Sequence, residues 1–304
     1  MAFAEAYRAQ VALLIRTLPY VGEERCFALK GGTAINLFLR DMPRLSVDID
    51  LTYLPVAPRA ESLAAIDGAM RRIAGRIEQG IPGTRITEGI TEGAVVRLTV
   101  RAQGVQTKIE VTPVLRGTAF DPVDMQVSAA VEDAFGFAEA QVVSFADLYA
   151  GKIVAALDRQ HPRDLFDIRD LLANEGITDD LREAFIIYLL SHGRPMAEVL
   201  GSRQKEISSA YSRGFLGMTQ EPVSLDDLLR ARQELVTSVV GGMPEQHRRF
   251  LVSFERGGPE WPLLAVRGAS DLPAIRWREE NLRKIPAGKR DALVMQLREV
   301  VGDT

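Results

Sequence analysis

The stretch from Lys30 to Asp50 restricts the fold more than any other part of the sequence. Residues 27–29 form a short apolar segment typical of a strand, and Gly31-Gly32 interrupts it. A helical pattern follows over residues 33–40. Residues 47–54 then alternate apolar and polar side chains, as a half-buried strand does. We therefore expect strand, glycine turn, helix and strand, in that order.

The second of these strands brings two carboxylates together. Side chains two positions apart on a strand share a face, so Asp48 and Asp50 point together while Ile49 points into the core. Two adjacent carboxylates repel each other unless a cation lies between them. Mg²⁺ prefers a few carboxylates together with phosphate oxygens. The pair therefore indicates a site for a divalent metal and a triphosphate.

The glycine turn supplies groups suited to phosphate. Backbone N–H groups at a glycine-rich turn and a helix N-terminus can approach phosphates closely. A hydroxyl from Thr33 and a cation from Lys30 or Arg44 would add to them. The predicted nucleotide-binding residues are Lys30, Gly31, Gly32, Thr33, Arg44, Ser46 and Lys108.

A third carboxylate is predicted from the strand at 105–114. This segment alternates strictly, which places Lys108 and Glu110 on one face. A neighbouring strand could bring Glu110 beside Asp48 and Asp50 as a third metal ligand. The alternative is a solvated strand face with cross-strand ion pairs, and the pattern of this strand taken alone favours that alternative.

The remainder of the chain changes character near residue 143. Before it, the patterns predict helices over 3–18, ended by Pro19, and over 60–79, together with further strands. After it, nearly every segment is helical, which predicts a catalytic domain over 1–143 and a helical domain over 144–304. The predicted strands are 84–91, 94–102 and 105–114, and the predicted later helices are 144–158, 163–174, 179–191, 224–240, 244–256, 276–284 and 288–301.

Charge and composition limit the partners. The formal net charge is −4, so any contact with RNA must come from a local basic patch. Segment 276–290 carries six basic residues around Trp277 and could be that patch. The favoured alternative is an amphipathic helix with Trp277 and Leu282 in the core. No membrane-spanning run or signal peptide is apparent, so we expect a cytoplasmic protein without membrane contact.

Two groups of motifs resemble a known family. Lys30-Gly31-Gly32-Thr33 followed by Asp48-Ile49-Asp50 resembles motif I of the DNA polymerase β-like nucleotidyltransferases, and most closely that of the AbiEii/MenT toxins. Segment 144–153, followed by Arg163-Asp164-Leu165-Phe166-Asp167, is similar to a later motif of that family. The fold implied is α+β: a polymerase β-like mixed sheet with flanking helices, then a largely helical C-terminal domain.

The resemblance also implies roles for individual residues. Asp48 and Asp50 would hold Mg²⁺, or Mn²⁺ in its place, with Glu110 as a third ligand. Lys152 would meet the triphosphate of the substrate NTP or the developing charge. Asp164 or Asp167 would orient Lys152 or assist deprotonation of the acceptor, and the sequence leaves that choice open. Without the resemblance, Lys152 reads as a surface lysine and the two acids as a solvated helix start.

The function implied is that of a toxin in a toxin–antitoxin or abortive-infection system, active in phage defence. It would transfer nucleotides from NTP, with release of pyrophosphate, to an RNA acceptor, foremost the 3′ end of tRNA, and so block translation. A separately encoded antitoxin would be its partner. The alternatives are transfer to a hydroxyl of a protein or small molecule, and a catalytically silent binding module that keeps the fold.

Overall fold

The computed structural model describes residues 5–302, which fall into two compact units. The first unit holds the chain up to Ser144 together with the short segment 217–222. The second holds residues 145–216 and the chain from Val223 onward. None of the helices in the described range is both long and apolar enough to cross a membrane.

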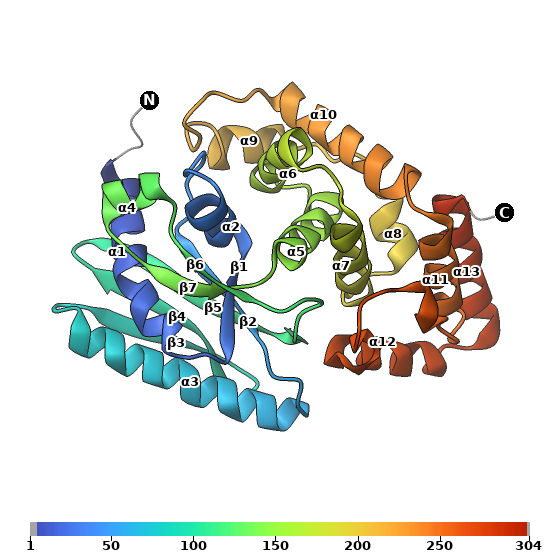
Figure 1. Cartoon of the computed structure of the whole chain (residues 1–304), viewed down its shortest axis with the longest axis horizontal. Coiled ribbons are helices and arrows are strands. Elements are labelled where there is room, and N and C mark those ends of the chain that lie inside the picture. Colours follow the sequence, from blue (N-terminus) through green and yellow to red (C-terminus); the bar gives the residue numbers. More distant parts are fainter. Residues whose placement is uncertain (1–4, 303–304) are drawn as a thin grey trace. The chain divides into compact units, whose positions relative to one another are not determined.

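A mixed β-sheet forms the centre of the first unit (Figure 1). Its strands are β1 (Phe27–Lys30), β2 (Asp48–Tyr53), β3 (Arg85–Thr91), β4 (Ala94–Ala102), β5 (Val105–Arg116), β6 (Val123–Gln126) and β7 (Glu139–Val142). Their order across the sheet is β3-β4-β5-β2-β1-β7-β6. The pairs β1–β7 and β2–β5 run parallel, and the other neighbours run antiparallel.

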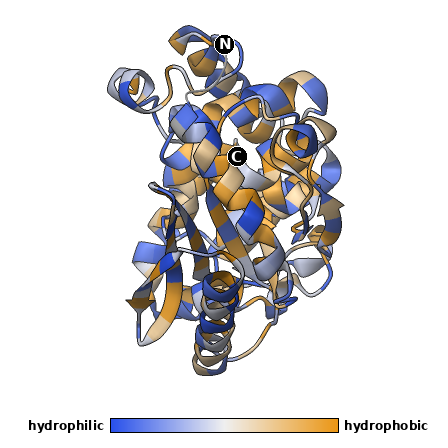
Figure 2. Ribbon diagram, turned by 90° about the vertical axis from the view of Figure 1, so that its left-hand side faces the viewer, coloured by the Kyte–Doolittle hydropathy of each residue, from blue (hydrophilic) through white to orange (hydrophobic). Residues whose placement is uncertain are grey.

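Helices bury one face of this sheet. The helices of the unit are α1 (Glu5–Gly22), the one-turn α2 (Gly31–Ala34) with the π-helical turn η1 (Ile35–Leu39), α3 (Arg59–Gly80) and α4 (Ala129–Phe135). Helix α3 packs against β4, and α1 packs against β5 and β7. Apolar residues at alternate strand positions, such as Leu98, Ile109 and Ile49, are fully buried. Helix α3 is amphipathic, so both apolar and polar residues are seen along its ribbon (Figure 2).

The second unit is helical. Its helices are α5 (Phe145–Asp158), α6 (Pro162–Asn174), α7 (Asp179–Leu190), α8 (Met196–Leu200), α9 (Ser208–Gly214), α10 (Leu225–Val236), α11 (Glu245–Glu255), α12 (Pro273–Lys284) and α13 (Ala287–Val301). The π-helical turn η2 (Thr237–Gly241) and the 3₁₀ turns η3 (Trp261–Leu263) and η4 (Ala269–Asp271) complete the unit. Helix α5 packs against α7 and α6, and α6 also packs against α10.

Two features differ from the sequence-based expectation. Helix α1 continues through Pro19 to Gly22, because Leu18 and Val21 are buried in the core and their burial outweighs one lost backbone hydrogen bond. Positions 3 and 4 of the predicted helix lie outside the described residues. Trp277 is 60% exposed and not in the core, whereas Leu282 is buried as predicted.

Candidate functional site

The turn between β1 and α2 places two glycines close to charged side chains, and its first position requires glycine. Gly31 has φ +75°, a conformation that L side chains rarely adopt. A Cβ atom there would lie 2.5 Å from Oδ2 of Asp50. A Cβ atom at Gly32 would lie 2.8 Å from Nη2 of Arg44. The two glycines therefore allow the backbone to lie directly against a carboxylate and a guanidinium.

Hydrogen bonds fix this turn to the start of β2. The buried Thr33 hydroxyl donates to the backbone oxygen of Asp48 at 2.5 Å and lies 3.1 Å from Oγ of Ser46. The buried Asn36 amide donates to the backbone oxygen of Gly32 at 2.8 Å. Thr33 and Ser46 thus hold the glycine turn in register with the residue that carries the first carboxylate.

Arg44 is buried beside the turn. Its side chain is 2% exposed, and Nη1 donates to the backbone oxygen of Leu45 at 2.9 Å. The segment 217–222 holds this part of the chain, because Arg44 pairs with Thr219 in a β-bridge and the Leu45 N–H donates to the oxygen of Met218. A segment distant in sequence therefore supports the predicted nucleotide-binding residues of the first unit.

Charged side chains alternate across four strands on the face opposite the apolar one. In the sheet register Lys30 pairs with Asp50, Asp50 with Glu110, and Glu110 with Arg97. Register partners point to the same side of a sheet, so these four share one face. Burial lowers the pKa of Lys30, and the carboxylate of Asp50 acts in the opposite direction. In the next row Asp48 pairs with Lys108.

The acidic pair of β2 fits a divalent cation. Asp48 and Asp50 share a face, both are partly exposed, and Gly31 allows the turn to lie against Asp50. Within residues 5–302, no group of three His, Cys, Asp or Glu side chains encloses a metal position. Glu110 instead lies 3.3 Å from Nη1 of Arg97 across the β4–β5 pair. Two carboxylates, with phosphate and water oxygens, match the preference of Mg²⁺.

A buried charge cluster occupies the second unit, where α5 meets α6. Nζ of Lys152 lies 2.9 Å from Oδ1 of Asp164 and 3.1 Å from Oδ2 of Asp167. These three side chains are at most 7% exposed, so Lys152 is not a surface lysine and the acids are not a solvated helix start. Arg159, which is 65% exposed, adds a second cation through both oxygens of Asp164.

The cluster keeps Asp164 ionised. Burial is the largest single influence and raises the pKa of Asp164, but Lys152 and Arg159 together outweigh it and hold that pKa well below its ordinary value. A carboxylate that is paired with two cations and titrates so low is a weak base. This geometry suits Asp164 to positioning Lys152 better than to taking a proton from an acceptor.

A comparison with known families identifies the chemistry. The sequence model described as "Nucleotidyl transferase AbiEii toxin, Type IV TA system" matches residues 12–278, well over half of the chain. The chain belongs to this family of AbiEii nucleotidyltransferase toxins. It is therefore a nucleotidyltransferase and a toxin of a type IV toxin–antitoxin system, which implies a separate antitoxin as its partner. None of the curated proteins matches the sequence.

A solved structure agrees with the AbiEii assignment at the level of the fold. The chain is similar to "MenT4, nucleotidyltransferase toxin Rv2826c from Mycobacterium tuberculosis H37Rv", with 19% identity and a TM-score of 0.59 over 82% of this chain and 89% of that one. The predicted α+β nucleotidyltransferase fold is thereby confirmed. A terminal uridylyl transferase 4 from Trypanosoma brucei with bound dUTP also matches, with 12% identity and a TM-score of 0.30 over 95% and 94% of the two chains.

The structure gathers the predicted residues in two groups, one in each unit. The first unit carries Lys30, Gly31, Gly32, Thr33, Arg44, Ser46, Asp48, Asp50, Lys108 and Glu110, and the second carries Lys152, Asp164 and Asp167. Two supporting residues had no role assigned from the sequence: Asn36, which holds the glycine turn, and Arg159, which holds Asp164. The position of Asn36 four residues after Gly32 in a helical segment was the available signal.

Proposed function

We propose that this AbiEii toxin transfers nucleotides from an NTP to RNA with the aid of Mg²⁺, that the 3′ end of tRNA is its acceptor, and that the transfer blocks translation in the cytoplasm. Membership of the nucleotidyltransferase toxin family supports the reaction class. The observation that carries the site is the pair Asp48 and Asp50 on one face of β2, with Asp50 directly against Gly31.

The proposed reaction is a substitution at phosphorus. A hydroxyl oxygen of the acceptor attacks the α-phosphorus of the NTP and forms a new oxygen–phosphorus bond. The bond from this phosphorus to the bridging oxygen of the β-phosphate breaks, and pyrophosphate leaves with the electron pair. The hydroxyl proton passes to a base or to water. Catalysis of such a step consists mostly of positioning and charge stabilisation.

The first unit offers groups for each part of that task. Asp48 and Asp50 would hold the cation, and Mn²⁺ has the same preference for carboxylate oxygens. A bound divalent ion would supply positive charge to the phosphates and to the leaving pyrophosphate. The Gly31-Gly32 backbone lies directly against the Asp50 carboxylate and the Arg44 guanidinium, so a phosphate at the turn would be close to a metal ligand and to a cation. Lys30 and Lys108, the register partners of the two aspartates, place cations beside them.

The roles of Lys152, Asp164 and Asp167 stay predictions. The cluster holds Nζ of Lys152 between two buried carboxylates, which fixes its position. We propose that Lys152 stabilises charge on the triphosphate and that both aspartates position it. Transfer by a Lys152→Met variant tests that role at a temperature at which thermal melting shows the variant to be folded.

A transfer assay tests the proposal. The full chain would be incubated with Mg²⁺, each of the four α-labelled NTPs and total tRNA. Separate reactions would replace the tRNA by a protein extract or by an aminoglycoside. We expect label on tRNA, and a loss of at least about a hundredfold in Asp48→Asn and Asp50→Asn.

Asp124→Asn is the matched control for these two variants. Asp124 is a half-exposed acid of the same unit, on β6, and it pairs with Arg25. We expect this variant to transfer as the wild type does. Label that appears only on protein or on the aminoglycoside would contradict the RNA acceptor. Equal transfer by the Asp48→Asn variant and the wild type would contradict the proposed site.

A further inference from the structure

The sheet face that carries the aspartates continues into a basic surface. In the register of β3, β4 and β5, Arg85 pairs with Arg101 and Arg101 with Gln106. One row nearer the aspartates, Lys108 pairs with Asp48. Successive residues on one face of a strand are about 7 Å apart, so the row of Arg101 lies about 7 Å from that of Lys108. We call Arg85, Arg101, Gln106 and Lys108 the basic strip.

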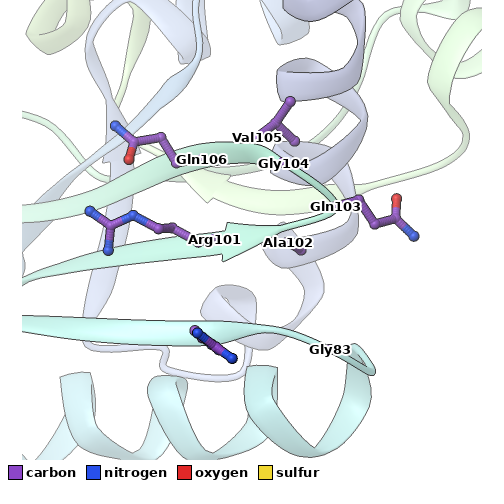
Figure 3. Close-up of a pocket in the computed structure, with 8 residues that line it drawn as sticks. Gly83, Arg101, Ala102, Gln103, Gly104, Val105 and Gln106 are labelled. Carbon is purple, nitrogen blue, oxygen red and sulfur yellow. The ribbon is translucent and has the colours of Figure 1, made fainter.

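A hollow marks the far end of the basic strip. It has a volume of about 480 Å³ and lies where β4 turns into β5 (Figure 3). Arg85, Arg101 and Gln106 line it together with Gly83 and Gly104. A Cβ atom at either glycine would meet nothing within 4 Å, so the backbone is open to a ligand there. Ala102 and Val105 are the only apolar residues in its lining.

Several arginines of the first unit are neutralised by carboxylates, whereas the cations of the basic strip are not. Arg25, Arg59, Arg71, Arg72, Arg76 and Arg97 each form an ion pair with a carboxylate. Among the described residues, Arg85 and Lys108 form no ion pair, and Arg101 donates to the hydroxyl of Thr87 at 3.0 Å. Arg85 and Arg101 are also directly opposite each other, an arrangement that destabilises a sheet.

We propose that the basic strip binds the phosphodiester backbone of the RNA acceptor and leads it to Asp48 and Asp50. This inference rests on the proposed function and names the surface that receives its acceptor. Arginine and lysine on an open polar surface are the groups that contact phosphates in nucleic-acid complexes. A protein partner would favour a buried apolar centre with aromatic anchors, and the strip has none.

Direct binding of RNA tests the inference without catalysis. The dissociation constant for fluorescent total tRNA would be measured without NTP at several salt concentrations between about 50 and 200 mM. The test variant is Arg85→Gln/Arg101→Gln. The control Arg25→Gln/Arg59→Gln removes the same two charges from exposed, ion-paired positions of the same unit. Both variants therefore have the same net charge.

We expect the test variant to bind tRNA more weakly, with a smaller dependence on salt. Two lost phosphate contacts reduce the slope of log K against log salt by about 1.4. Between about 50 and 200 mM salt, the wild type should therefore lose about sevenfold more of its affinity than the test variant does. We expect the control to keep the wild-type slope. Thermal melting would confirm that both variants fold. Removal of the two opposed arginines should not destabilise the Arg85→Gln/Arg101→Gln variant.

Three results would overturn the inference. The first is a wild type that does not bind tRNA, and the second is an equal loss in both double variants, which would indicate net charge alone. In the third, the strip variant loses binding of a fluorescent polyglutamate peptide but keeps that of tRNA, which would indicate an acidic protein partner. Failure of the proposed function is recognised separately. If the wild type binds tRNA through the strip but transfers no label to it, the proposed reaction is refuted and the binding role of the strip is still supported.

Discussion

Replacement of Lys152 by methionine should destabilise the second unit strongly. The change removes the ammonium but keeps a side chain of similar length. Asp164 and Asp167, each 1% exposed, would then remain in the interior. Asp164 keeps Arg159, whereas Asp167 loses its ion pair with Lys152. Removal of one partner from a buried ion pair costs about 3–5 kcal/mol, because the remaining charge stays desolvated.

Urea denaturation followed by tryptophan fluorescence measures this loss. Both tryptophans of the chain, Trp261 and Trp277, belong to the second unit, so the signal reports that unit alone. Lys284→Met is the matched control, since Lys284 forms an ion pair with Glu280 in which both side chains are more than 60% exposed. We expect the control to lose less than about 1 kcal/mol in the free energy of unfolding.

A triple variant separates charge from packing. Lys152→Met combined with Asp164→Asn and Asp167→Asn removes the buried carboxylates as well, and should recover a large part of the lost stability. Equal effects of Lys152→Met and Lys284→Met would refute the reasoning. A triple variant less stable than Lys152→Met would also refute it, since packing and not charge would then dominate.

Two other predictions concern the turn and acid stability. Gly31→Ala should lower the free energy of unfolding by more than the roughly 1–2 kcal/mol of left-handed strain, and it should abolish transfer. Gly93→Ala, with φ +79° and nothing within 4 Å of its Cβ, should lower it by the strain alone. Circular dichroism in urea compares the two variants, and equal losses of stability would contradict the close approach of Gly31 to Asp50. Because its cations hold the pKa of Asp164 below 3.8 in the folded chain, its contribution to stability is complete above that pH and is lost as the pH falls below it. The unfolding free energy of the wild type should therefore fall more steeply than that of Asp164→Asn below pH 3.8, and parallel curves would contradict the assignment.

Local patterns predicted most elements but not the interactions between distant segments. The alternation of β5 and the periodicity of α3 appear in the sequence because each element buries one regular face. The role of segment 217–222 depends on a β-bridge to Arg44 that no local pattern encodes. Pro19 shows the same limit, since burial by distant residues overrides a local preference.

The site was predictable to a similar degree. Asp48, Asp50 and the two glycines follow from strand periodicity and turn chemistry. The pairing of Glu110 with Arg97 depends on the register of β4 against β5, which the sequence did not specify. That pairing is the cross-strand alternative considered for Glu110, and its role as a metal ligand stays a prediction. The burial of Lys152 between two acids required the packing of α5 against α6.

Binding of Mn²⁺ tests the central claim most directly, because it reports the metal site without any acceptor. Electron paramagnetic resonance would measure free Mn²⁺ in the presence of a non-hydrolysable NTP analogue for the wild type, Asp48→Asn, Asp50→Asn and the control Asp124→Asn. Glu110→Gln would show whether Glu110 is a third ligand. We expect Asp48→Asn and Asp50→Asn to weaken binding by about tenfold or more and the control to bind as the wild type does. Wild-type affinity in both aspartate variants would contradict the account.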